Sequence, residues 1–289
     1  MTKPDIEQTQ PSLDRRGAMG LGLAAAAALS APAAARAATR QLDPANPDDA
    51  RLIYRKLRYR TDDGLIFSWI KGPYMAAIDG DLIPMYAINL GSFSRVTQRA
   101  DGSFELRDLE ISFRTDPETG QRLTSFRNPV TGQTLPVVER VQGPNRVIMS
   151  PDNHAQISDM PGGPHFELTH YPVRPFAIGQ DIAIRDRTHA RVTGRDGVSM
   201  LNEVSTISGP RAQVLDPAVT SVASRAQSND VRSFPAWLNM GDRAGHLALF
   251  GNGGKVHRFD DLPEDWRAML HEVFPAIAAD PIAALDGRG

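Results

Sequence analysis

The chain has 289 residues, of which 32 are basic and 34 acidic, so its formal net charge is −2. This balance gives no electrostatic reason to expect a nucleic acid or an anionic membrane as partner. The chain has no cysteine, which excludes disulfides, thiolate zinc sites, iron–sulfur clusters and cysteine nucleophiles. Its 22 Pro and 24 Gly are typical of a β-rich fold with many turns.

The first 37 residues have the features of an export signal. Arg15-Arg16 precedes an apolar stretch at 17–31, and Ala35-Arg36-Ala37 is a small-x-small cleavage site. The arginine pair predicts the twin-arginine route, with the twin-arginine translocase as partner during export and a periplasmic protein cleaved near Ala37. An N-terminal membrane anchor that is left uncleaved is the alternative.

The next segments change from linker to strands. Residues 38–60 predict a linker followed by a short helix at 48–57. Apolar segments at 65–70, 74–78 and 82–96 predict strands separated by glycine-containing turns. In 104–115 the side chains alternate with a period of two, which is the pattern of a half-buried strand; the apolar members are Leu109, Ile111 and Phe113, and the polar members are Glu110, Ser112 and Arg114.

A turn motif occurs twice between 116 and 133. The sequence reads Asp-Pro-Glu-Thr-Gly-Gln at 116–121 and Asn-Pro-Val-Thr-Gly-Gln at 128–133. Asp or Asn before Pro starts a turn, and the glycine supplies the positive φ that closes it. The six residues between the copies fit a strand but not a helix. We therefore expect a β-meander here that fixes strand register and helps to close the sheet.

The second half predicts more strands and a final helix. Strands are expected at 134–141, 146–150, 166–171, 180–193, 198–207 and 246–250, and a helix is possible at 217–226. The glycine-rich residues 251–254 are interpreted as a turn. A last helix begins near Asp260 or Asp261, with Pro263 in its first turn; its core-facing stripe is Trp266, Met269, Leu270 and Val273.

About ten strands in meander order, with one or two flanking helices, predict a mainly β fold. An antiparallel sheet of this size tends to curl and close, which removes its edges. We expect a closed or nearly closed lipocalin-like (calycin-type) barrel at 61–260, followed by a C-terminal helix and tail at 261–289. The mouth of such a barrel holds a small ligand.

The densest polar segment is 165–171, which contains His-x-Glu-x-x-His. Alternate strand residues leave opposite faces, so Glu167 and His170 point apart and a shared metal ion is disfavoured. The row of His165, Glu167, Thr169 and Tyr171 either faces water or, if it faces the interior, provides an acid/base pair. His170 then lies on the other face, as a proton donor or as a hydrogen-bonded core histidine.

A second row, Arg185, Arg187, His189 and Arg191, is either solvated surface or, if internal, a site for a carboxylate or phenolate ligand. Glu203 interrupts an apolar strand, where it is either a salt-bridge partner or a buried carboxyl with raised pKa. Trp69, Tyr86 and Trp237 are candidates for ligand stacking, although core or rim positions would explain them equally well.

Three segments together resemble a known bacterial family. They are the doubled turn, the run Phe234-Pro235-Ala236-Trp237-Leu238-Asn239-Met240-Gly241-Asp242-Arg243, and Leu262-Pro263-x-x-Trp266. They are similar to the family catalogued as domain of unknown function 1838, over residues 42–275. Members often carry export signals, which agrees with the N-terminus, but the resemblance implies no catalytic residues.

Two functional hypotheses follow. In the first, the barrel is a metal-free, cofactor-free lyase or isomerase for a hydrophobic, aromatic or terpenoid-like small molecule. Glu167 or Glu203 would be its base and Tyr171 or His170 its proton donor, while Trp69, Tyr86, Arg187 and Trp237 would bind the ligand. In the second, the barrel is a periplasmic carrier that binds such a molecule without changing it.

Overall fold

The computed structural model of the protein describes residues 40–137, 139–156, 165–194 and 197–287. The predicted export signal at 1–37 lies outside these residues. Within the described part of the chain, no helix has the length and apolar character needed to cross a membrane.

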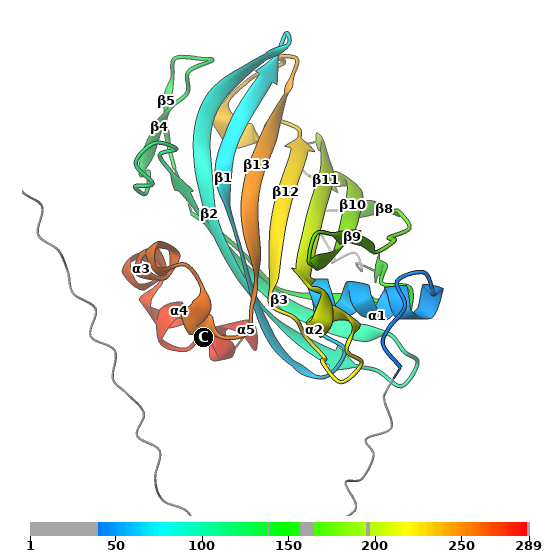
Figure 1. The fold of residues 1–289 in the computed structure, drawn as a ribbon. Coiled ribbons are helices and arrows are strands. Elements are labelled where there is room, and N and C mark those ends of the chain that lie inside the picture. Colours follow the sequence, from blue (N-terminus) through cyan, green and yellow to red (C-terminus); the bar gives the residue numbers. More distant parts are fainter. Residues whose placement is uncertain (1–39, 138, 157–164, 195–196, 288–289) are drawn as a thin grey trace, which may run out of the picture. The chain divides into compact units, whose positions relative to one another are not determined.

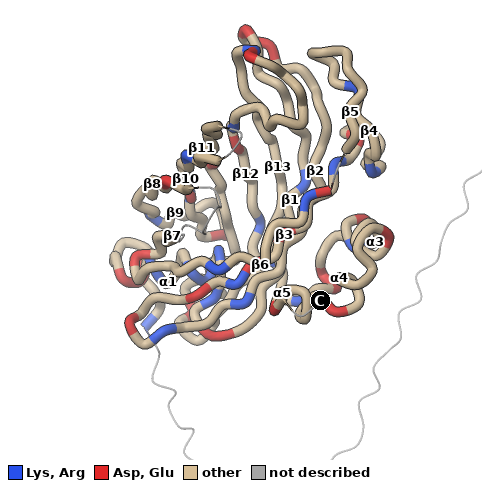
Figure 2. The backbone as a smooth tube through the Cα atoms, turned by 180° about the vertical axis from the view of Figure 1, so that it is seen from behind, with Lys and Arg blue, Asp and Glu red and all other residues tan. Residues whose placement is uncertain are grey.

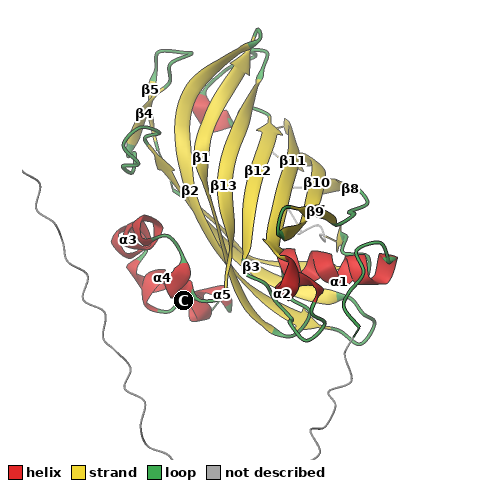
Figure 3. Cartoon of the chain, viewed as in Figure 1, coloured by secondary structure: helices red, strands yellow, loops and turns green. Residues whose placement is uncertain are grey.

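The described chain is organised around one antiparallel sheet that curls into a nearly closed barrel (Figures 1 and 3). The predicted mainly β barrel is therefore confirmed. Along the sheet the strand order is β7-β6-β3-β2-β1-β13-β12-β11-β10-β8, and β9 also pairs with β10. The strands are β1 (Gly64–Ile78), β2 (Asp81–Gln98), β3 (Phe104–Thr115), β6 (Arg140–Met149), β7 (Ala155–Gln156), β8 (His165–His170), β9 (Phe176–Ile178), β10 (Asp181–Gly194), β11 (Gly197–Pro210), β12 (Ser224–Arg232) and β13 (His246–Val256).

Among the described strands, the barrel has a seam between the two ends of this strand order. β1 pairs with β13 and so joins the first and last strands of the chain. β7 and β8 are instead the outermost strands, and side chains connect them. His170 Nε2 lies 3.2 Å from the carbonyl oxygen of Ala155, and the rings of His154 and His170 stack with centroids 4.8 Å apart.

Helix α1 (Pro47–Arg58) lies at one end of the barrel (Figure 1). The side chain of Asn46 accepts hydrogen bonds from the first-turn amides, and Pro47 occupies a position where no amide donor is needed. Ile53 and Leu57 are fully buried in a cluster that also contains Ile182. The short helix α2 (Arg211–Leu215) contributes to the same cluster. The helix predicted at 48–57 is confirmed.

The C-terminal helices cover the outer face of β2 and β3. They are α3 (Glu264–Val273), α4 (Pro275–Ala279) and α5 (Pro281–Leu285), preceded by the 3₁₀ turn η2 (Phe259–Asp261). Trp266 is completely buried, and its Nε1 donates to the carbonyl oxygen of Ile111 at 3.2 Å. Phe93 and Phe113 pack beside it. The predicted apolar stripe of the last helix is thus part of the core.

The apolar and polar side chains that alternate along β3 face the opposite way from a usual core strand: the apolar ones lie outside the barrel and the polar ones inside. Its apolar residues, Leu109, Ile111 and Phe113, pack outward against the helices. Its polar residues point into the barrel, where Asp108, Glu110, Ser112 and Arg114 line the cavity. A period of two reveals that a strand has two faces, but it does not reveal which face is inside.

The doubled turn has the predicted local chemistry but not the predicted role. Asp116 and Asn128 each accept hydrogen bonds from amides two and three residues ahead, and Gly120 and Gly132 have φ values of 71° and 73°. The strands between and after the turns, β4 (Ser125–Arg127) and β5 (Thr134–Pro136), form a separate two-stranded sheet. The expectation that this meander fixes the barrel register was wrong.

The second turn instead packs against another segment of the family pattern, the 3₁₀ turn η1 (Ala236–Leu238). Asn128 is fully buried, and its Nδ2 donates to the carbonyl oxygen of Leu238 at 2.9 Å. Phe126 packs against Tyr86 and Trp237, with ring centroids 5.6 and 6.1 Å away. The doubled turn therefore anchors η1 beside the barrel.

Two further local expectations were wrong. Residues 217–226 do not form a helix, because Ser224 begins β12. The glycine-rich residues 251–254 do not form a turn but continue β13. Glycine is needed there because neighbouring strands approach closely: a Cβ on Gly253 would lie 2.0 Å from the carbonyl oxygen of Trp69.

Candidate functional site in the barrel cavity

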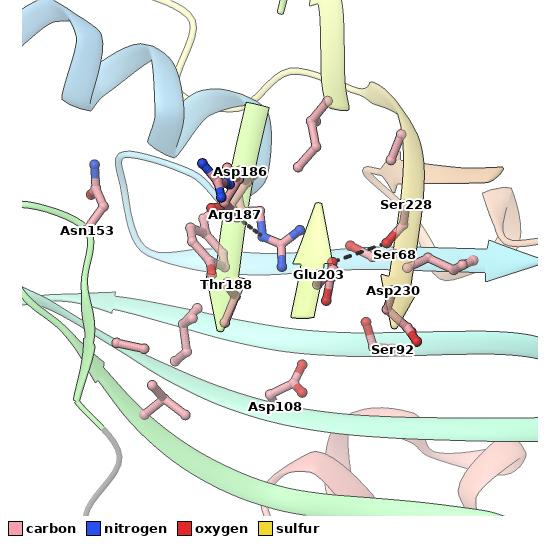
Figure 4. A pocket seen from close by; sticks show the side chains of 18 of the residues that line it. Ser68, Ser92, Asp108, Asn153, Asp186, Arg187, Thr188, Glu203, Ser228 and Asp230 are labelled. Carbon is pink, nitrogen blue, oxygen red and sulfur yellow. Dashed lines mark hydrogen bonds and ion pairs between the residues drawn. The ribbon is translucent and has the colours of Figure 1, made fainter. Parts of the chain in front are cut away.

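The barrel encloses a cavity of about 2410 Å³, lined by the inner faces of its strands and by one side of α1 (Figure 4). Typical small-molecule sites occupy about 300–1,000 Å³. The wall is mixed, with aliphatic and aromatic side chains beside hydroxyls, carboxyls and guanidinium groups. The cavity is therefore the candidate functional site.

One wall carries a row of polar residues from three adjacent strands. Strand register pairs Ser68 with Ser92 and Ser92 with Glu110. Burial raises the pKa of Glu110 to about 7, with a further contribution from the nearby charge of Asp108. Arg140 and Arg232 oppose this rise but do not cancel it. Glu110 can therefore both donate and accept a proton near neutral pH.

Asp108 lies two residues before Glu110 on the same inner face. Burial raises its pKa, while a hydrogen bond from the Ser94 hydroxyl and the charge of Arg58 act in the opposite direction. Two carboxyls on one strand face thus share a poorly solvated wall, which explains why neither ionises as readily as a free carboxyl.

The other wall carries two carboxyls that are direct cross-strand neighbours, Glu203 on β11 and Asp230 on β12. Glu203 accepts hydrogen bonds from the hydroxyls of Ser205 (2.6 Å) and Ser228 (3.1 Å). The hydroxyl oxygens of the two serines lie 2.9 Å from each other. Ser228 approaches Glu203 from the neighbouring strand (Figure 4), and Ser205 lies on the same strand as Glu203, so the two hydroxyls fix the position of the carboxylate.

Asp230 belongs to a buried cluster with Tyr74 and Arg232. It accepts hydrogen bonds from the Tyr74 hydroxyl at 3.2 Å and from Arg232 Nε at 2.8 Å. Burial raises the pKa of Asp230 despite these contacts, and the charge of Glu203 adds to the rise. Burial also raises the pKa of Tyr74 well above its ordinary value, so this phenol is protonated at neutral pH.

The two walls are electrostatically coupled across the cavity. The charges of Arg232 and Glu203 both influence the pKa of Glu110, although they belong to opposite strands of the barrel. A molecule in the cavity would therefore lie between two carboxyls in different surroundings. The pKa of Glu110 is about 7, while Glu203 accepts hydrogen bonds from two hydroxyls.

The end of the cavity near α1 contains a third polar group. Asp186 accepts a hydrogen bond from the Tyr54 hydroxyl at 3.2 Å and forms an ion pair with Arg58 Nε at 3.4 Å. Both partners come from α1. The helix therefore closes this end of the cavity and also supplies charge to it.

Lys255 lies in the wall near the same end, and burial lowers its pKa to about 7. Its Nζ donates to the carbonyl oxygens of Lys56 (2.7 Å) and Tyr59, and to the Ser221 hydroxyl at 3.1 Å. Two of these contacts hold the C-terminal end of α1 and the third binds the segment before β12, so Lys255 has a structural role.

All four predicted ligand-binding residues border the cavity. Tyr86 and Trp237 pack with ring centroids 5.3 Å apart, and the Arg114 guanidinium lies 4.6 Å from the Trp237 ring. Arg187 lies at the rim, 4.2 Å from the ring of Tyr171. Trp69 borders the cavity as well but packs mainly with the helix-covered cluster.

The predicted catalytic residues are divided between two faces of the barrel. Glu203 and His170 line the cavity, and Tyr171 lies at its rim. Glu167 faces outward, where it forms an ion pair with Arg191 at 3.2 Å and keeps 52% of its side chain exposed. Since Phe166 and Leu168 occupy the inner face of β8, Glu167 cannot act on a molecule inside the barrel.

The sequence argument did not single out five of the carboxyls that line the cavity: Asp108, Glu110, Asp152, Asp186 and Asp230. Three of them, Asp108, Glu110 and Asp186, lie on predicted strands, but a period of two does not reveal which face of a strand is inside. Among the described residues, no group of His, Asp and Glu has a geometry suited to hold a metal ion.

The fold and the cavity define a class of protein: a nearly closed antiparallel β-barrel with a large interior that contains ionisable groups. The family model described as "Protein of unknown function (DUF1838)" matches residues 61–288, and the chain belongs to this family. Comparisons with curated proteins and with solved structures found no match.

Proposed function

We propose that the protein is an acid/base enzyme that acts, without a metal, on a small molecule bound in the barrel cavity. The observation that carries this proposal is Glu110, a cavity carboxyl whose pKa is raised to about 7 by burial. Burying ionisable groups destabilises a fold unless they are paired. A carrier for an apolar molecule would need no such group in its wall.

In the proposed mechanism, Glu110 donates or accepts a proton on one side of the substrate. Glu203, positioned by Ser205 and Ser228, acts as base from the opposite wall. Arg232 and the protonated Tyr74 would stabilise negative charge that develops on the substrate. Lyase or isomerase chemistry fits this set, because it requires only placed proton donors and acceptors in a cavity that excludes bulk water.

The substrate would be hydrophobic over much of its length and include an aromatic or similarly flat part. Tyr86 and Trp237 offer ring faces at one end of the cavity. Stacking on such rings favours flat, apolar groups. His170 and Tyr171, near the seam, are then more distant candidates for proton transfer than Glu110.

The test begins with the small molecules that co-purify with the exported protein, identified by mass spectrometry. Turnover of these molecules and of their chemical relatives is then measured for the wild type, Glu110→Gln and Glu203→Gln. We expect each variant to lose about 100-fold or more in turnover, the usual contribution of a general acid or base. Glu105→Gln is the control, since Glu105 lies on the same strand but outside the cavity and pairs with Arg146 at 2.7 Å. Unchanged turnover in both cavity variants would refute the assignment.

A carrier without catalytic activity is the second candidate. The cavity volume of about 2410 Å³ favours it, since storage of a bulky ligand needs space rather than tight positioning. In that case the co-purified molecule would be recovered chemically unchanged after long incubation. Its release, rather than its conversion, would be the step that can be measured.

We also propose that the chain is exported through the twin-arginine route. Arg15-Arg16 and the apolar stretch at 17–31 support this. Replacing both arginines with lysine should retain the precursor in the cytoplasm, as cell fractionation would show. Continued export of the lysine variant would argue for another route.

A further inference from the structure

The cavity reaches the surface beside the seam, where strand β10 is only partly covered. β9 pairs with residues 181–183 of β10, and β8 pairs with residues 188–193. Among the described strands, none pairs with Ile184–Arg187 of β10 on that side. Residues 171–175 connect β8 to β9 there and border the cavity. We call this opening, with His154 and His170 at its edge, the seam mouth.

Two arginines border the seam mouth. Arg187 lies on β10 and Arg174 on the connection after β8; both are exposed and both line the cavity. Figure 2 shows basic residues beside β8 and β10. Within the described residues, neither of the two forms an ion pair with a carboxylate. Arg187 instead stacks on Tyr171, at 4.2 Å from the ring.

Arginines elsewhere on this side of the barrel differ in this respect. Arg146 pairs with Glu105 at 2.7 Å, and Arg51 pairs with Asp152 at 2.9 Å. Arg191, on the same strand as Arg187, pairs with Glu167. Carboxylates are thus available on this surface, but the arginines of the seam mouth do not use them.

The charged residues that line the cavity are also mostly basic. Ten Arg and Lys residues but only six Asp and Glu residues line the cavity, whereas acidic residues outnumber basic ones in the whole chain. Beside the seam mouth the wall includes the apolar side chains of Leu168 on β8 and Phe176 on β9, and the carboxylate of Asp186, which is already paired with Arg58. Cationic side chains without a carboxylate partner therefore lie next to apolar wall at this entrance.

We propose that the seam mouth binds the anionic head of an amphiphilic molecule, a carboxylate or a phosphate, whose apolar body extends into the cavity. Guanidinium groups bind these two anions through paired hydrogen bonds. This inference rests on the proposed function in that it names the chemical class of its substrate. It concerns recognition alone, so it can be tested without turnover.

The test compares two fluorescent probes of nearly the same shape. 8-Anilinonaphthalene-1-sulfonate carries an anionic group, and N-phenyl-1-naphthylamine lacks it; both fluoresce when they enter an apolar site. The wild type should bind the anionic probe more tightly, and added salt should reduce this preference. In the double variant Arg174→Gln/Arg187→Gln, the anionic probe should bind about tenfold more weakly, the effect of losing one or two charge-assisted hydrogen bonds. The neutral probe should bind as before.

Arg191→Gln is the matched control, since it removes an arginine from the same strand outside the cavity and should change neither affinity. Competition then defines the head group. Dodecanoate and dodecyl phosphate should displace the anionic probe, while dodecanol should not, and the more effective anion identifies the preferred chemistry. Equal affinity of the two probes, equal competition by dodecanol, or identical behaviour of the double variant and Arg191→Gln would overturn the proposal.

The outcome is independent of catalysis. Glu110→Gln should retain the preference for the anionic probe, because Glu110 lies away from the seam mouth. A retained preference together with absent turnover would leave the anion site standing and refute the enzymatic function. Turnover of a neutral substrate, together with equal binding of the two probes, would support the enzymatic function and refute the anion site.

Discussion

The two faces of the wall formed by β1, β2 and β3 have the same backbone and opposite chemistry. The outer face carries large apolar side chains such as Phe93 and Ile111, which the C-terminal helices cover completely. The inner face carries Ser92, Asp108 and Glu110, which line the cavity. The outer face therefore packs against the helices, whereas the inner face carries, beside buried residues such as Ile66 and Leu106, the polar groups that a binding or catalytic site needs.

The largest effect should come from the outer face. Trp266→Ala removes the completely buried indole that α3 packs against β2 and β3. We expect the free energy of unfolding to fall by about 4 kcal/mol, as for other large-to-small substitutions of buried aromatics. Urea unfolding followed by circular dichroism would measure this. A loss below about 1 kcal/mol would mean that the helices contribute little to the fold.

A change on the inner face should affect stability in a pH-dependent way. Glu110 has a pKa of about 7 in the folded protein and about 4.3 in an unfolded chain. Between these values the folded state binds more protons, so the stability of the wild type falls as pH rises from 4 to 7. Glu110→Gln should remove this dependence and should be more stable than the wild type at pH 8, by on the order of 2–3 kcal/mol.

Thermal unfolding of both proteins from pH 4.5 to 8 provides the measurement. Glu105→Gln is the control, because Arg146 lowers the pKa of Glu105 and the sign of its pH dependence is reversed. Parallel pH profiles for the wild type and Glu110→Gln would show that Glu110 is not a poorly solvated carboxyl.

A substitution at Gly91 tests how closely the outer face of β2 packs against Trp266. A Cβ at this position would lie 2.4 Å from Cε2 of Trp266, so Gly91→Ala should cost about 2 kcal/mol through overpacking. Combining it with Trp266→Ala should give less than the sum of the two losses, since the second substitution removes the clash. Strict additivity in a double-mutant cycle would contradict this packing.

The smallest effect should come from Ser92, the inner-face neighbour of Phe93. Ser92→Ala should change the free energy of unfolding by less than about 0.5 kcal/mol, whereas Phe93→Ala should cost about 3–5 kcal/mol. The same urea titrations compare these adjacent positions on one strand. Similar losses at both positions would mean that the two faces do not divide stability and function as described.

Much of the architecture follows from local sequence patterns. The alternation in β3 predicts a strand, and the apolar stripe around Trp266 predicts a helix with a buried side; both are present. Glu203 was singled out because a carboxyl in an apolar strand is costly, and it does line the cavity. The strand at 166–171 was predicted, but the orientation of Glu167 could not be known from strand periodicity.

The amino-acid sequence by itself determined most of the strands, the doubled turn, the final helix and the family of this protein, because these depend on short-range backbone preferences and periodicity. Tertiary structure alone decided which side of each strand is inside. The apolar face of β3 turns outward because the C-terminal helices bury it, and the polar face then has only the cavity left to line. The same packing brings Glu110 and Glu203, far apart in the chain, to opposite walls of one site.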